Sequence, residues 1–170
     1  MMQLNDAEKV VIDGYGEWVL SRDDDVIRFF GEDGQFRTYP HHPLLHGSMF
    51  RECWINNDDG IALIVDSYGR EVYKLDGKTG DIVKVVELNR HENTDRGLYF
   101  SRFEESGKYI LFIYEGGIVC LLKNGELVWS HQHDKLDWRF VGVENGLVKY
   151  ASEFRGEWGY TLSDGEKVYL

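Results

Sequence analysis

The chain is patterned as short runs of apolar residues, each bounded by Gly, Asn or Asp. The clearest example is residues 107–131, where three apolar runs are joined by two tight turns, and a weaker copy lies upstream at residues 60–86. Short runs rich in Val, Ile, Tyr, Phe and Trp between such turns predict β-strands. No stretch shows a convincing apolar repeat at helical spacing, so the pattern predicts an all-β chain.

Four equivalent turns divide the chain into repeats. A Gly that follows Asp or Asn supplies the positive φ that a tight hairpin turn requires. One strand-like run lies on each side of every turn, and two further runs come before these, which gives four strands per repeat. In the third repeat we expect the first of these strands at Leu98–Phe103. By subtraction the turns lie 46, 45 and 40 residues apart, and they are Asp33-Gly34, Thr79-Gly80, Asn124-Gly125 and Asp164-Gly165.

The sequence therefore predicts four copies of a four-stranded antiparallel meander. A period of about 40–45 residues with four strands per unit is typical of β-propellers. We expect a single all-β domain over residues 1–170 with a small β-propeller-like fold, and we keep a β-sandwich and an open half-propeller as alternatives. An open form would leave strand edges unpaired, so we expect a monomer or an edge-paired dimer. The predicted repeats cover approximately residues 8–39, 50–88, 98–131 and 138–170.

Two stretches resemble the repeat of known β-propellers. Residues 73–83, Tyr-Lys-Leu-Asp-Gly-Lys-Thr-Gly-Asp-Ile-Val, resemble the strand, the Lys-Thr-Gly-like turn and the second strand of propellers of the pyrroloquinoline-quinone type. Residues 122–129, Leu-Lys-Asn-Gly-Glu-Leu-Val-Trp, are similar to the same unit with a shorter turn and the Trp that often ends it. At fold level the repeat also resembles WD-type propellers. The resemblance implies fold only, because the quinone enzymes have about twice as many blades, and we expect no cofactor.

The charge of the chain restricts its partners. With 19 Lys and Arg against 30 Asp and Glu, the formal net charge is −11 and the sequence pI is about 4.9. This charge repels the phosphate backbone, so we expect no nucleic-acid partner, and it attracts a basic protein. The plainer explanation is that an acidic surface keeps a small protein in solution.

Features that would place the protein in a membrane or outside the cell are missing from the sequence. Residues 1–9 lack the basic and apolar segments of a signal peptide, and the longest apolar runs are too short to span a bilayer. Cys53 and Cys120 both lie in strand-like runs, where we expect buried, reduced thiols. We therefore expect no membrane association and a cytoplasmic location.

Catalytic motifs are also missing from the sequence. No Ser or Cys lies in a Gly-x-Ser-x-Gly turn, and Gly77-Lys78-Thr79 lacks the upstream glycine and the following helix of a phosphate loop. The alternative to a non-enzymatic protein is a small enzyme or a metal- or ligand-binding propeller with a His-lined pocket. Its residues would be His41, His42, His46, His131 and His133.

Long connections between the repeats form the candidate binding surface. In a propeller, the connections that enter each first strand and those between second and third strands share one end of the molecule, and here these are the long ones. Loops on a rigid scaffold commonly carry binding, and acids mixed with aromatic residues and Arg are typical of protein-binding faces. The predicted partner-binding residues are Glu92, Asp95, Arg96, His133, Asp134, Asp137, Trp138, Glu153, Phe154, Arg155 and Glu157.

These features together predict a non-enzymatic, acidic protein-binding module. A sharper hypothesis is an immunity-type inhibitor, which would neutralise a basic toxin such as a nuclease with a carboxylate-rich face that mimics phosphate. The charge of −11 would steer such a pair together.

Overall fold

The computed structural model of the chain is all-β. It describes residues 8–12, 16–21, 26–31, 36–40, 50–56, 59–66, 71–76, 81–89, 100–133 and 138–170. No helix within these ranges is long and apolar enough to cross a membrane.

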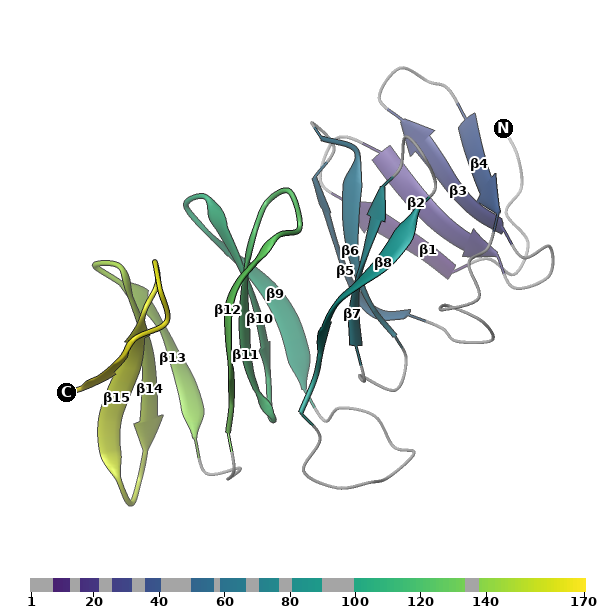
Figure 1. Cartoon of the computed structure of the whole chain (residues 1–170). Coiled ribbons are helices and arrows are strands. Elements are labelled where there is room, and N and C mark those ends of the chain that lie inside the picture. Colours follow the sequence, from purple (N-terminus) through teal and green to yellow (C-terminus); the bar gives the residue numbers. More distant parts are fainter. Residues whose placement is uncertain are drawn as a thin grey trace. The chain divides into compact units, whose positions relative to one another are not determined.

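Within the described residues, sixteen strands form four four-stranded sheets, and neighbouring strands in each sheet follow one another in the chain (Figure 1). The first sheet contains β1 (Glu8–Ile12), β2 (Gly16–Ser21), β3 (Val26–Gly31) and β4 (Phe36–Pro40). The second contains β5 (Phe50–Asn56), β6 (Ile61–Asp66), β7 (Glu71–Asp76) and β8 (Ile82–Glu87). The third contains β9 (Ser101–Ser106), β10 (Tyr109–Tyr114), β11 (Gly117–Leu122) and β12 (Leu127–Gln132). The fourth contains β13 (Arg139–Glu144), β14 (Leu147–Ser152), β15 (Gly156–Thr161) and β16 (Lys167–Tyr169).

The predicted fold class, four repeats of a four-stranded antiparallel meander, is confirmed. The largest difference in strand ends is at β9, which spans Ser101–Ser106 and not the predicted Leu98–Phe103. Phe103 pairs with Phe112 and Ser106 with Tyr109, so the polar residues after Phe103 still belong to the ladder. The turn that follows begins at Gly107, whose φ of +58° suits glycine.

The chain divides into two compact units, residues 1–85 and residues 86–170. The expectation of a single domain over residues 1–170 stays a prediction. In the first unit, the buried side chains described lie mainly on β6 and β7. All five residues from Ile61 to Val65 are buried, so β6 is covered on both faces, as expected of an inner strand.

The core of the second unit lies between the β9–β12 sheet and the β13–β16 sheet. Both sheets turn one apolar face toward this core, because alternate residues of a strand point to the same side. The buried residues of the cluster are Leu111, Ile113, Ile118, Cys120 and Trp129 from the first of these sheets, and Val148, Tyr150, Trp158, Tyr160 and Leu162 from the second sheet and its edge.

Polar groups on β12 also connect these two sheets. The Trp129 indole Nε1 donates a hydrogen bond to the Leu162 carbonyl oxygen at 2.8 Å. The His131 ring stacks on Tyr160 with 4.0 Å between ring centroids, and its Nε2 lies 2.6 Å from the Gly165 carbonyl oxygen. Buried polar atoms with such partners add specificity to an otherwise apolar interface.

Asn89, just beyond β8, forms hydrogen bonds with residues at the edges of the β9–β12 sheet. Its backbone N–H donates to the Tyr114 hydroxyl at 2.9 Å, and its side-chain Nδ2 donates to the carbonyl oxygens of Gly116 at 3.0 Å and His133 at 3.4 Å. A Cβ on Gly116 would lie 2.1 Å from the Asn89 carbonyl oxygen, so only glycine permits this approach. These hydrogen bonds hold the end of β10, the start of β11 and the end of β12 close to one another.

The face of the β13–β16 sheet that points away from the core of the second unit carries charged side chains. Lys149 there donates a hydrogen bond to Glu144 at 2.6 Å, whereas the corresponding residues of the β9–β12 sheet are buried and apolar. A face with charged side chains packs poorly against a further apolar sheet, because the charges would have to leave water. By strand pairing, Leu111, Ile113, Ile118 and Cys120 correspond to Lys149, Ala151, Glu157 and Gly159.

Candidate functional site

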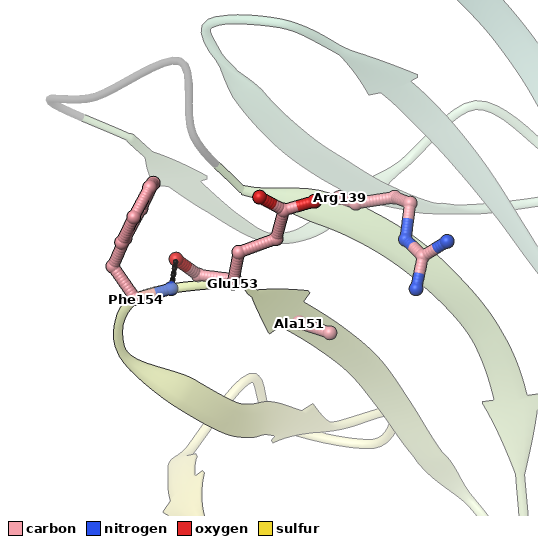
Figure 2. Close-up of a pocket in the computed structure, with 5 residues that line it drawn as sticks. Arg139, Ala151, Glu153 and Phe154 are labelled. Atoms are coloured by element: carbon pink, nitrogen blue, oxygen red, sulfur yellow. Dashed lines mark hydrogen bonds between the residues drawn. The ribbon is translucent and has the colours of Figure 1, made fainter.

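A pocket of about 440 Å³ opens in the second unit where β14 turns into β15 (Figure 2). The strand β13 contributes Arg139 to one wall, because Arg139 pairs with Ala151 across the ladder. The pocket is lined by Arg139, Ala151, Ser152, Glu153 and Phe154. It therefore combines a guanidinium, a carboxylate, a hydroxyl and an aromatic ring within a few residues of chain.

The turn between β14 and β15 presents Phe154 to solvent. The backbone N–H of Phe154 donates to the Ser152 hydroxyl oxygen at 3.2 Å, which is the dashed bond in Figure 2. Gly156 closes the turn with a φ of +81°. Phe154 is 85% exposed, so its ring lies in water rather than in the core. An ordered turn with a solvated ring resembles the anchor positions of protein-binding surfaces.

A second aromatic group lies beside this turn. The Arg155 guanidinium carbon lies 5.6 Å from the centre of the Trp138 ring, a cation–π distance. Trp138 in turn meets the buried Trp158 edge-on, with centroids 4.9 Å apart. Trp138 is half-buried, so the core of the unit supports it while part of its ring faces outward. Arg and Trp together are over-represented among the residues that dominate binding energies.

The predicted partner-binding residues fall into three groups. Trp138, Glu153, Phe154, Arg155 and Glu157 all lie at this turn or at its adjoining strand ends. His133, by contrast, is 5% exposed and meets the rings of Tyr150 and Trp158 edge-on. Glu92, Asp95, Arg96, Asp134 and Asp137 lie outside the described residues.

The histidines of the alternative, metal-binding reading are only partly described. His41, His42 and His46 lie outside the described residues. His131 and His133 share a face of the β12 segment, but Nε2 of His133 lies 3.1 Å from the Tyr160 hydroxyl and that of His131 faces the Gly165 carbonyl. Within the residues that the structure describes, no group of three or more His, Cys, Asp or Glu is placed to hold a metal ion.

Sequence reasoning missed part of the pocket wall, namely Arg139, Ala151 and Ser152. A signal for Arg139 was present, since it directly follows the predicted binding residue Trp138. The pairing of Arg139 with Ala151 depends on strand register, and the bulge between Phe140 and Gly142 makes that register irregular.

Comparisons with known proteins identify a fold and no family. No family model matches the chain, and no curated protein matches it. Among solved structures, a catalytically inactive virginiamycin B lyase from Staphylococcus aureus is similar with a TM-score of 0.54 at 12% identity, over 100% of this chain and 57% of that chain. The selenomethionine form of the S. aureus lyase gives 0.50 at 15% identity, over 95% of this chain and 54% of that chain.

A third similar structure is the extracellular domain of a one-component system from B. thetaiotaomicron, with a TM-score of 0.51 at 12% identity. It covers 95% of this chain and 23% of that chain. The present chain thus spans little more than half the length of the lyases that it matches. Identities this low support architecture and not activity. With the four meander sheets, these similarities show that the chain has a β-propeller-like fold.

Proposed function

We propose that the protein is a protein-binding module and that the pocket at the β14–β15 turn receives a segment of its partner. The observation that carries this proposal is the ordered turn that holds Phe154 85% exposed at the mouth of the pocket. A ring of this size lowers the free energy of a complex when a partner covers it, because about 25 cal/mol is gained per Å² of apolar surface removed from water.

The chemistry of the pocket favours a partner segment with a cationic side chain. The Phe154 ring offers a face for a cation–π contact, and the Glu153 carboxylate offers a charge-assisted acceptor beside it. Arg139 on the opposite wall can donate to a carbonyl or carboxylate of the same segment. The chain's net charge of −11 supports a basic protein as the partner. The sharper form of the proposal is an immunity-type inhibitor of a basic toxin such as a nuclease, acting in the cytoplasm without a cofactor.

Phe154→Ala tests the pocket. We expect this variant to weaken binding to a basic nuclease toxin about 30-fold, the effect of removing a central aromatic anchor worth roughly 2 kcal/mol. Its unfolding midpoint in urea should match that of the wild type, because the ring makes little contact with the core. Affinities are measured by biolayer interferometry against a panel of purified, catalytically inactive basic nucleases at about 50 and 200 mM salt.

Leu127→Ala is the matched control, since Leu127 is another exposed apolar side chain but lies at the start of β12, outside the pocket. It should leave affinity unchanged. Glu153→Gln should slow association and reduce the salt dependence of binding. If no nuclease of the panel binds, the toxin hypothesis fails. If one binds with equal affinity to wild type and Phe154→Ala, the pocket is not the contact surface.

A further inference from the structure

Two polar groups in the core of the second unit have no hydrogen-bond partner among the described residues. They are the Tyr150 hydroxyl and the Trp158 indole Nε1. Their side chains are 2% and 3% exposed, so bulk water does not serve them. The two rings stack with 4.8 Å between centroids and an interplanar angle of 8°. Leaving both groups unsatisfied would cost about 1–3 kcal/mol each, which native proteins rarely tolerate.

The surrounding side chains do not satisfy these two groups. His133 meets both rings edge-on, but its Nε2 lies 3.1 Å from the Tyr160 hydroxyl. The Tyr160 hydroxyl and the His133 ring therefore contact each other, while the Tyr150 and Trp158 groups lack a protein partner among the described residues.

Electrostatic effects agree with the burial of the Tyr150 hydroxyl. Burial is the main cause that raises the pKa of Tyr150, and the neighbouring Tyr160 and Tyr114 raise it further. The Tyr150 and Tyr160 rings belong to the same buried cluster, with 6.2 Å between their centroids, and the Tyr160 hydroxyl contacts His133. A region with several donors and acceptors is where buried water binds in proteins, typically with two to four hydrogen bonds.

We propose that ordered internal water binds between the β9–β12 and β13–β16 sheets, accepting the Trp158 indole hydrogen and bonding to the Tyr150 hydroxyl. Such water would hold Trp158 in the position that supports Trp138, which meets it edge-on at 4.9 Å. This inference does not depend on the proposed function, because it concerns the core of the unit and not its partner.

Water at Trp158 is detectable by NMR on the intact chain labelled with ¹⁵N. We expect a cross-peak between water and the Trp158 indole hydrogen in a ¹⁵N-edited ROESY spectrum, with the sign of a through-space contact and not of chemical exchange. Trp129 is an internal control, because its equally buried indole donates to the Leu162 carbonyl at 2.8 Å and should give no such peak. Triple-resonance assignment identifies the indoles without a variant that risks unfolding. Absence of the Trp158 cross-peak overturns the proposal.

Tyr150→Phe gives a second test through the sign of its effect. If water bonds to the hydroxyl, removing it should lower the folding equilibrium constant about five-fold, the effect of one lost hydrogen bond. If the hydroxyl is bare, removing it should raise that constant, because a buried unsatisfied group disappears. Tyr160→Phe, which loses a defined contact with His133, calibrates the measurement in urea. A stabilised Tyr150→Phe protein would overturn the proposal at this residue.

Discussion

Replacing Gly165 with Ala should destabilise the protein by roughly 3 kcal/mol. A Cβ at this position would lie 2.6 Å from Cγ and 2.7 Å from Cδ2 of Trp129. Trp129 is not free to move away, because its indole donates to the Leu162 carbonyl at 2.8 Å. Forcing apart this contact costs about 1–3 kcal/mol, and the left-handed backbone of Gly165, with φ of +74°, adds about 1–2 kcal/mol for any residue with a Cβ.

Gly146→Ala separates the two contributions. Gly146 has nearly the same φ, +73°, but nothing lies within 4 Å of its added Cβ. This variant should therefore lose only the backbone contribution, about 1–2 kcal/mol. Urea unfolding, followed by tryptophan fluorescence, measures both variants against the wild type. Equal losses in the two variants would show that the Trp129 contact does not constrain the turn.

The second large effect is alkaline destabilisation between about pH 9 and pH 12. Burial raises the pKa of the Cys120 thiol to about 12. Burial also raises the pKa of Tyr114 to about 12; the hydrogen bond from the Asn89 backbone opposes this and the Glu115 charge adds to it. Burial further raises the pKa values of Tyr150 and Tyr160. In the unfolded chain these groups ionise at their ordinary values, about 8.5–9 for Cys and about 10 for Tyr.

The sign of the effect follows from proton binding. Between the ordinary and the raised pKa values, the folded protein holds more protons than the unfolded chain, so the free energy of unfolding falls as pH rises. The loss approaches about 1.4 kcal/mol per pH unit for each such group. Stability should therefore be complete below about pH 9 and decrease steeply toward pH 12. Urea titrations at pH 8, 9, 10 and 11 measure the slope, and Tyr114→Phe should reduce it. A flat profile over this range would contradict the assigned burial.

The repeats and strands of this protein were predictable because the turns and the alternation of side chains are local properties of the sequence. Asn124-Gly125 marks the β11–β12 turn, and the apolar run Tyr109–Tyr114 marks an inner strand, without knowledge of any distant contact. The end of β9 was not predictable in the same way. Its polar residues after Phe103 resemble a turn, and only pairing with β10 keeps them in the strand.

The candidate site was predicted in part. The exposed aromatic and acidic residues of the β14–β15 turn follow from its place between two strands, whereas the contribution of Arg139 depends on pairing across β13 and β14. His133 was expected on the surface, but it is buried. Its backbone N–H donates to the Gly116 carbonyl at 2.8 Å, so the strand pairing extends to residue 133. The His133 side chain therefore points to the same side as those of Trp129 and His131. The spacing of these three residues by two positions was a usable signal for a shared, core-facing side.

The charged outer face of the β13–β16 sheet has a consequence for the behaviour of the protein at high concentration. A sheet that presents an apolar face to water can pack against a complementary face of another molecule, and such head-to-tail contacts can grow into fibres because each added molecule offers the same face again. Here Lys149 and Glu157 occupy the positions where the preceding sheet has Leu111 and Ile118, so such growth would have to strip water from two charges. These two side chains thus oppose the stacking of another molecule's apolar sheet on this face.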